Sequence, residues 1–203
     1  MTGKGSLNHN SRKFHAKNTD PNRTHWNVEY CNEDIKDVYH ELFDEALKRY
    51  NDKQTRKDRK IDDYYEKIRS GKQEKLFHEV ILQIGDKDNM RSETMEGQLA
   101  AKVLDEYMKG FQERNPTLRV FAAHLHLDEA TPHLHIDFIP YVTGSKRGLD
   151  TRVSLKQALS SLGFKGGSRS ETELNQWVQS EKEKLAMVMR ENEIEWEQKG
   201  THE

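Results

Sequence analysis

Two stretches of alternating polar and apolar residues, joined by a short turn, constrain this chain more than any other feature of its sequence. Residues 120–140 read VFAAHLHLDEATPHLHIDFIP. Successive side chains of a strand point to opposite faces, so each stretch has one polar and one apolar face. The intervening Asp-Glu-Ala-Thr-Pro is short enough to join antiparallel neighbours. The sequence therefore predicts a hairpin with strands over 118–127 and 133–142, whose apolar face packs on helices.

The polar face of this hairpin carries four histidines. His124 and His126 share a face of the first strand, and His133 and His135 share a face of the second. Same-face neighbours on a strand lie about 6.6 Å apart, and cross-strand neighbours lie roughly 4.5–5.5 Å apart at Cβ. Three imidazoles so placed can bind one cation and leave open positions for water or substrate. We therefore expect His126, His133 and His135 to bind a metal ion.

The sequence leaves the roles of two neighbours of this trio, His124 and Asp137, open. His124 could be a fourth ligand, a group behind the ligands or a phosphate contact. Asp137 could accept a hydrogen bond from a ligand imidazole. From the residues alone, imidazole ligands suit Zn, Fe, Ni, Cu and Mn better than Ca or Mg.

The rest of the chain mixes strands and helices without a repeating βαβ unit. This order favours an α+β fold with a central antiparallel sheet flanked by helices. We expect one domain over residues 1–203, with 1–23 as a basic N-terminal arm and 170–203 as a C-terminal helix. The remaining expected elements are strands over 24–30 and 76–84 and helices over 33–50, 57–69, 93–114 and 154–162.

Composition excludes several classes of protein. No run approaches the roughly 18 apolar residues of a membrane span, and the first ten residues lack the apolar core of a secretory signal. The lone cysteine, Cys31, excludes a disulfide framework. We therefore expect a soluble protein of a reducing cytoplasm. The net charge is −2, yet residues 1–23 carry five basic residues against one acid and residues 143–169 carry six against one. Such local fields attract polyanions.

Three sequence motifs resemble one family. The string from His126 to His135, HLDEATPHLH, is similar to the signature of the Mob/Pre plasmid mobilisation relaxases, within the His-hydrophobic-His endonuclease superfamily. His9-Asn10-Ser11-Arg12 is similar to that family's first motif, His-Asn-x-Arg, and residues 20–27 resemble the segment that follows it. Since family members often carry a long C-terminal extension, we expect this chain to be the N-terminal catalytic domain.

This resemblance implies a relaxase/rolling-circle-initiator-like sheet of about five strands and a bound Mn²⁺ or Mg²⁺. It implies an enzyme that nicks one DNA strand at an origin of transfer, joins the 5′-phosphate covalently to His9, and later rejoins the strand. Glu129 would accept a proton from His9 or orient it. Arg12 would bind the phosphate, and Asn10, Arg12 and Arg23 would contact DNA. The expected partners are single-stranded or supercoiled origin DNA and other transfer proteins.

Three other functions remain open at this point. A rolling-circle replication initiator would share the hairpin but use a tyrosine nucleophile, for which Tyr30 is the candidate. A metal-dependent nuclease would release its product without a protein–DNA conjugate. A DNA-binding module without activity would hold a structural metal in a closed, four-coordinate site.

Overall fold

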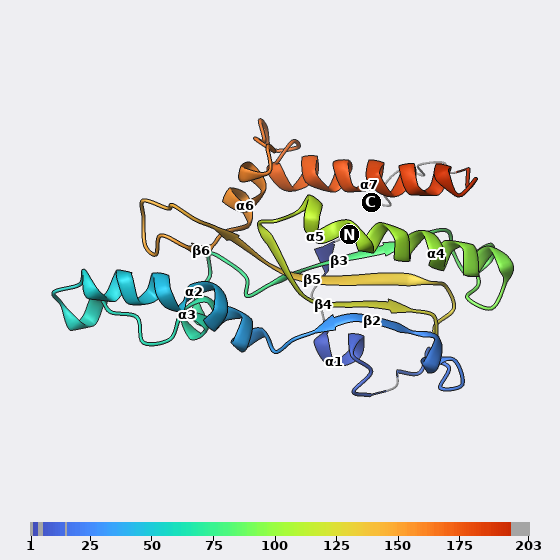
Figure 1. Cartoon of the computed structure of the whole chain (residues 1–203), viewed down its shortest axis with the longest axis horizontal. Coiled ribbons are helices and arrows are strands. Elements are labelled where there is room, and N and C mark those ends of the chain that lie inside the picture. Colours follow the sequence, from blue (N-terminus) through green and yellow to red (C-terminus); the bar gives the residue numbers. More distant parts are fainter. Residues whose placement is uncertain (1, 4–5, 15, 196–203) are drawn as a thin grey trace.

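An antiparallel sheet forms the centre of the computed structural model, which describes residues 2–3, 6–14 and 16–195 (Figure 1). Its strand order is β1-β3-β5-β4-β2, and β6 pairs with β5 outside this path. The expected α+β fold with a sheet of about five strands is therefore confirmed. The strands are β1 (Thr2–Gly3), β2 (Val28–Asn32), β3 (His78–Gln83), β4 (Leu118–His126), β5 (His133–Val142) and β6 (Arg152–Val153).

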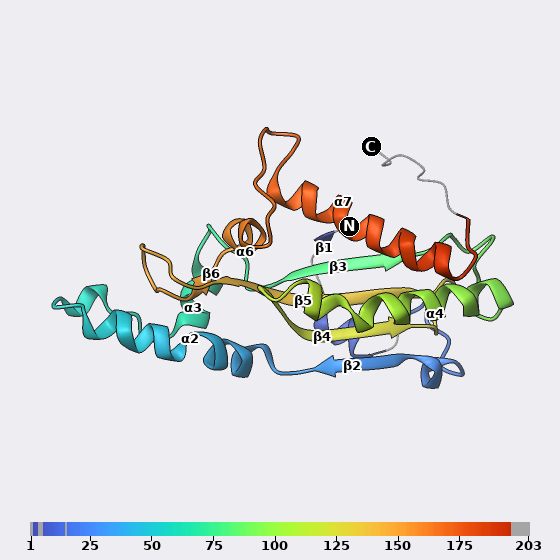
Figure 2. The same cartoon turned by 45° about the horizontal axis from the view of Figure 1, so that its top comes forward.

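The two faces of the sheet have different neighbours. The helices α4 (Met95–Lys109) and α7 (Glu173–Glu191) lie on one face, and the short helix α1 (Leu7–Asn10) lies on the other (Figures 1 and 2). Apolar residues of β3, β4 and β5 pack against α4 and α7 in one core. The histidines alternate with these residues in the sequence, so they point to the face that carries α1.

A second, smaller core lies at one end of the sheet. The helices α2 (Ile35–Asp52) and α3 (Tyr64–Ser70) pack there around Tyr39, Phe43 and Tyr64. Two further helices, α5 (Phe111–Arg114) and α6 (Leu155–Ser161), complete the fold. Among the described residues, no helix combines the length and apolar character needed to cross a bilayer.

The hairpin agrees with its prediction, and several other boundaries do not. β5 has the predicted bounds, and β4 ends one residue earlier than expected. The helix expected over 93–114 is broken at Gly110 into α4 and α5. The helix expected over 57–69 is a 3-10 turn followed by α3. Asp63 caps the start of α3, because its side chain accepts a hydrogen bond from the Glu66 amide.

Two further boundaries differ from their predictions, and capping explains the first. α7 begins after Thr172, whose hydroxyl accepts from the Asn175 amide, and not after Ser170. The strand expected over 24–30 is a 3-10 turn at Thr24–Trp26, and β2 follows it. Residues 1–23, expected as an arm or loop, contain β1 and α1. The end of the expected C-terminal helix, residues 196–203, lies outside the described residues.

Candidate active site

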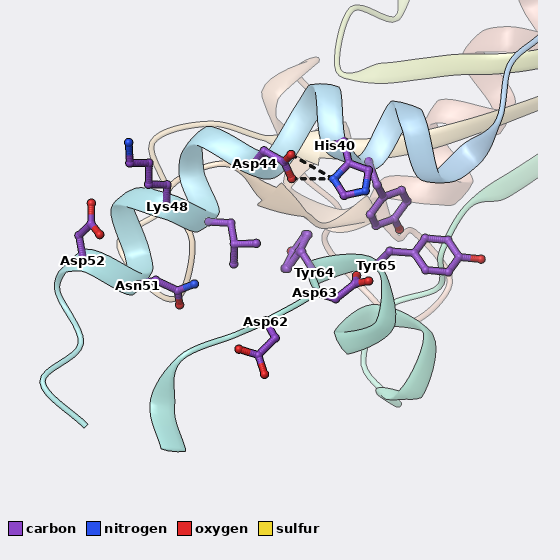
Figure 3. A pocket seen from close by; sticks show the side chains of 11 residues that line it. His40, Asp44, Lys48, Asn51, Asp52, Asp62, Asp63, Tyr64 and Tyr65 are labelled. Atoms are coloured by element: carbon purple, nitrogen blue, oxygen red, sulfur yellow. Dashed lines mark hydrogen bonds and ion pairs between the residues drawn. The ribbon is translucent and has the colours of Figure 1, made fainter. Parts of the chain in front are cut away.

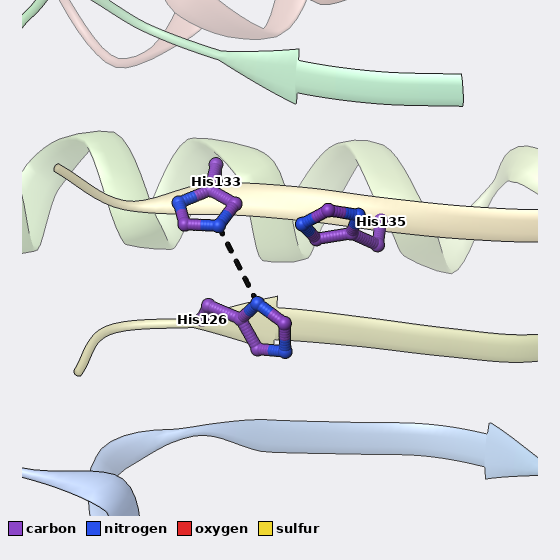
Figure 4. Close-up of side chains that lie close together, drawn as sticks. All are labelled: His126, His133 and His135. Carbon is purple, nitrogen blue, oxygen red and sulfur yellow. Dashed lines mark hydrogen bonds between the residues drawn. The ribbon is translucent and has the colours of Figure 1, made fainter. Parts of the chain in front are cut away.

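The three predicted ligands come together on the sheet face that carries α1. His126 ends β4, and its register partner His133 begins β5, with His135 two residues further on. Figure 4 shows the three rings turned toward one another. Each residue offers one ligand atom, and these atoms all lie within 4.8 Å of one another. The hairpin register therefore produces the arrangement that the alternating sequence predicts.

Each of these rings is held by a hydrogen bond at one of its two nitrogens. His126 Nε2 lies 2.8 Å from the backbone oxygen of Asn10, and His133 Nδ1 lies 2.9 Å from that of Thr131. His135 Nδ1 lies 2.7 Å from Glu79 Oε1. Metal-bound histidines normally donate their second ring nitrogen to a carbonyl or carboxylate in this way. These acceptors place the N–H groups away from the centre of the trio.

The remaining ring nitrogens face one another as a donor set for a cation. His126 Nδ1 and His133 Nε2 are 3.4 Å apart, and both carry lone pairs when the opposite nitrogens are protonated. His135 Nε2 is buried and has no hydrogen-bond partner within the described part of the chain. A cation coordinated by three nitrogens would satisfy all three atoms, so the residues present fit a divalent metal.

Burial keeps the ligand rings in the form that binds metal. Desolvation lowers the pKa of His126 to about 2, against the opposing effect of the Asn10 carbonyl. Desolvation also lowers the pKa of His133. Both imidazoles are therefore neutral at physiological pH, as ligation requires.

His9 lies beside the trio, as predicted for a nucleophile. It belongs to α1, and its ring centroid lies 6.0 Å from that of His126 and 6.5 Å from that of His135. His9 Nε2 lies 3.3 Å from Glu129 Oε1 and 3.2 Å from Arg12 Nη1. The nitrogen that would attack thus has a proton acceptor on one side and a donor on the other.

Arg12 is placed differently from the sequence prediction. Its Nε and Nη2 donate to the two oxygens of Asp128 at 2.9 and 2.5 Å, and Nη2 also donates to Glu129 Oε1 at 2.9 Å. Its Nη1 contacts the backbone oxygen and Nε2 of His9. Its Nε and both Nη2 N–H groups are therefore engaged with carboxylates, one Nη1 N–H donates to the His9 oxygen, and the side chain is 8% exposed. In this structure Arg12 is held against Asp128, Glu129 and His9, and its expected contact with the phosphate stays a prediction.

The backbone at Arg12 is also unusual. Its φ is 52°, in the left-handed region that non-glycine residues seldom adopt. The hydrogen bonds from the Arg12 side chain to Asp128 and Glu129 hold the residue in this conformation. Such conformations persist only where surrounding contacts fix them, and they cluster at functional sites.

The other two predicted DNA contacts are also engaged within the protein. Asn10 is 2% exposed, and its Nδ2 donates to Glu79 and Asp137. Arg23 Nη1 donates to the backbone oxygens of Leu127 and Glu129, and its Nε donates to Asp20. Both side chains therefore have partners within the protein, and their expected contacts with DNA stay predictions.

The structure also settles where His124 and Asp137 lie. His124 Nε2 contacts Glu29 Oε2 at 3.2 Å, and His124 does not belong to the set of converging ligand atoms. Asp137 accepts a hydrogen bond from Asn10 and not from a ligand ring. Its pKa is raised to about 7 by burial and by the charge of Glu79, against the effect of Asn10.

Glu79 holds His135 in the way that Asp137 was expected to hold a ligand. Sequence reasoning missed this residue. The available signal was an acidic residue inside the apolar run LFHEVILQI, because an acid in such a run is buried and needs a polar partner.

A second group of candidate ligands overlaps the trio. His9, His126 and Glu129 also offer atoms within 4.8 Å of one another. The Arg12 guanidinium already contacts His9 and Glu129, however, and its positive charge opposes a second cation there. The geometry therefore favours one metal position, at His126, His133 and His135.

The rival nucleophile lies on the wrong face of the sheet. Tyr30 packs with the core beneath α4, and its hydroxyl donates to Asp105 of α4 at 2.7 Å. Burial and the neighbouring Asp105 carboxylate raise its pKa, which disfavours the phenolate that would attack. The tyrosine mechanism therefore has no support from Tyr30.

A cavity of about 480 Å³ lies elsewhere, between α2 and α3 (Figure 3). Three tyrosines and four aspartates are among its lining residues: Tyr39, Tyr64, Tyr65, Asp44, Asp52, Asp62 and Asp63. It contains none of the converging histidines. Its acidic lining would repel a DNA backbone, so we do not assign it to the nucleic-acid site.

Comparison with known proteins agrees with this geometry. The family model described as plasmid recombination enzyme, Mob_Pre, matches residues 5–187. A crystal structure of the MobM relaxase domain (MOBV; Mob_Pre), bound to 22 nucleotides of plasmid pMV158 oriT DNA and to Mn at pH 5.5, is 23% identical. It covers 97% of this chain and 86% of that chain, with a TM-score of 0.52.

A second structure of that domain carries 22-nucleotide oriT DNA with a 3′-thiophosphate and Mn at pH 6.8. It is 22% identical, covers the same shares of the two chains and has a TM-score of 0.50. No curated protein sequence matches this chain. At these identities the solved structures establish the shared fold. The family model spans most of the chain, and on that basis this protein belongs to the Mob_Pre family of plasmid recombination enzymes.

Proposed function

We propose that this protein is a metal-dependent DNA relaxase. It nicks one strand at an origin of transfer, holds the 5′-phosphate on His9 and rejoins the strand, which initiates mobilisation of a plasmid or integrative element. The observation that carries this proposal is the position of His9 Nε2, beside three converging histidines and 3.3 Å from Glu129. Family membership and the fold of a relaxase domain bound to Mn and oriT DNA support it.

The metal ligands in this proposal are His126, His133 and His135. A bound Mn²⁺ or Mg²⁺ would polarise the non-bridging oxygens of the scissile phosphate and orient it for attack. Glu79 and the backbone oxygens of Asn10 and Thr131 hold the three rings in the required tautomers. This support fixes the ligand set before DNA binds.

His9 and Glu129 perform the covalent step. Glu129 Oε1 accepts the Nε2 proton of the His9 imidazolium, and the lone pair that this leaves on Nε2 attacks phosphorus. The N–P bond forms, the P–O3′ bond breaks, and the departing 3′-oxygen takes up the proton. The product is a phosphoramidate that a returning 3′-hydroxyl can displace. General-base assistance of this kind contributes about 10²–10⁴ in rate.

Arg12 acts by orientation in this scheme. Its two hydrogen bonds to Asp128 fix the guanidinium, which then restrains Glu129. Its Nη1 donates to His9 Nε2 when that nitrogen carries no proton. His9 Nε2 therefore has a partner whether or not it is protonated. Arg12 positions the catalytic pair and does not need to contact DNA.

The wider context is also part of the proposal. We place the relaxase domain over residues 1–203, with 1–23 and 170–203 as its basic arm and C-terminal segment. Origin DNA, single-stranded or in a supercoiled plasmid, is the substrate, and other transfer proteins in a bacterial cytoplasm are the partners. Five basic residues of 143–169 are exposed and remain available for DNA contact: Lys146, Arg147, Lys156, Lys165 and Arg169.

The test is a nicking assay that also traps the conjugate. Supercoiled plasmids carrying candidate origins are incubated with the protein and Mn²⁺, and the nick and the modified residue are mapped under non-acidic conditions, which preserve a phosphoramidate. We expect a conjugate on His9 that is absent from His9→Ala and retained in Tyr30→Phe. A conjugate that persists without His9 refutes the nucleophile assignment, and turnover without any conjugate favours a simple nuclease.

A further inference from the structure

Asn10 connects the helix of the nucleophile to two strands of the sheet. It is the last residue of α1 and follows His9 directly. Its amide Nδ2 donates to Glu79 Oε1 at 2.8 Å and to Asp137 Oδ2 at 3.1 Å. Glu79 and Asp137 are register partners on β3 and β5. One buried amide therefore fastens the end of α1 to two neighbouring strands.

Asn10 also supports two of the metal ligands, one directly and one through Glu79. Its backbone oxygen accepts from His126 Nε2 at 2.8 Å. Glu79 Oε1, which accepts from the Asn10 amide, also accepts from His135 Nδ1 at 2.7 Å. A displacement of Asn10 would therefore disturb the hydrogen bonds that orient both His126 and His135.

α1 depends on such contacts for its position. It has four residues, far fewer than an isolated helix needs to be stable in water. Asparagine suits the position because its amide has two N–H groups, and each has one carboxylate to bond. An aspartate would bring a third carboxylate to the same place, and an alanine would leave both acceptors without this donor.

We infer that Asn10 is a positioning residue that sets the orientation of His126 and His135 and holds His9 beside the metal site. This role rests on the proposed function, because it assigns Asn10 to the same centre. It replaces the direct DNA contact expected from the sequence, for which a side chain that is 2% exposed offers no surface.

The helix supplies a matched control for the experiment. Asn8 lies two residues before Asn10 in α1 and is exposed. Asn10→Ala and Asn8→Ala are compared with the wild type in two assays. Mn²⁺ affinity is measured without DNA by electron paramagnetic resonance of the free ion. DNA affinity is measured without metal by the fluorescence anisotropy of a single-stranded oligonucleotide containing the mapped nick site.

We expect Asn10→Ala to bind Mn²⁺ about tenfold or more weakly, the range typical of residues that support metal ligands. Its DNA affinity should stay within about twofold of the wild type. Asn8→Ala should change neither value. An Asn10→Ala variant with unchanged Mn²⁺ affinity overturns the inference, and a selective loss of DNA affinity would restore the direct contact.

Two further arms keep the test decisive. If circular dichroism shows that Asn10→Ala does not fold, Asn10→Ser replaces it, because serine keeps one donor and should show a smaller loss of Mn²⁺ affinity. Wild-type Mn²⁺ affinity in Asn10→Ser would then overturn the inference. A wild-type protein that binds Mn²⁺ but nicks no DNA refutes the proposed function alone, since the metal comparison needs no DNA.

Discussion

Replacing Arg12 with alanine should cost this fold more stability than any surface charge. The Arg12 side chain is 8% exposed and that of Asp128 is fully buried, and two hydrogen bonds join them. Removing the Arg12 guanidinium leaves the Asp128 carboxylate buried without these two hydrogen bonds and without the neighbouring positive charge. Loss of one partner of a buried ion pair typically costs about 3–5 kcal/mol.

The pKa of Asp128 provides a second estimate of this loss in the free energy of unfolding. Burial opposes ionisation of Asp128, but the hydrogen bonds and the positive charge of Arg12 outweigh it and lower the pKa from 3.8 to about 2. A carboxyl with a lowered pKa stabilises the fold above its ordinary pKa, and this contribution is lost as the pH falls through the folded value. Such a shift is worth about 2 kcal/mol at pH 7 and about 1 kcal/mol at pH 3. Together the two arguments place the loss at about 2–4 kcal/mol at neutral pH.

Urea denaturation of the wild type and Arg12→Ala at pH 7 and pH 3 measures this loss. Arg49→Ala is the control, because Arg49 also makes two 2.8 Å hydrogen bonds to one aspartate, Asp150, but both side chains are substantially exposed. Exposed pairs contribute about 0–1 kcal/mol. A loss for Arg12→Ala below 1 kcal/mol, or one that does not shrink between pH 7 and pH 3, refutes the reasoning.

Three further predictions concern catalysis, the metal and the opposite core. Glu129→Gln should slow nicking by about 10²–10⁴ and leave Mn²⁺ affinity within a few-fold, measured by gel time courses and metal titration; an unchanged rate contradicts the proton-acceptor role. Chelation should abolish nicking without unfolding the chain, and added Mn²⁺ should restore it; loss of the circular dichroism signal on chelation would indicate a structural metal. Glu181→Ala should destabilise the fold by about 2–4 kcal/mol in thermal melts, because Glu181 accepts from Tyr107, Arg114 and Asn115; a loss within 0.5 kcal/mol contradicts it.

The sequence predicts the features that depend on local periodicity. Alternation over residues 120–140 predicts both strands of the hairpin and the face that gathers His126, His133 and His135, because strand geometry alone determines them. The proximity of His9 to this trio came from the family resemblance, since no local rule brings residue 9 beside residue 126.

The sequence does not reveal partners that the fold brings together from distant positions. The family resemblance predicts DNA contacts for Asn10 and Arg12 and does not reveal their partners within the protein, which lie 69 to 127 residues away on β3, β5 and the hairpin turn. Glu79 is recognised as a support for His135 only when β3 and β5 are placed in register. Helix ends were missed for a different reason, because capping by Asp63 and Thr172 competes with neighbouring polar residues that look equivalent in the sequence.

Anomalous diffraction from crystals soaked in Mn²⁺ tests the central claim most directly. The structure predicts one strong peak bonded at about 2.1–2.3 Å to a ring nitrogen of each of His126, His133 and His135, with His9 adjacent but unbonded. A peak among His9, His126 and Glu129, or bound Mn²⁺ that contacts none of the three hairpin histidines, would contradict it.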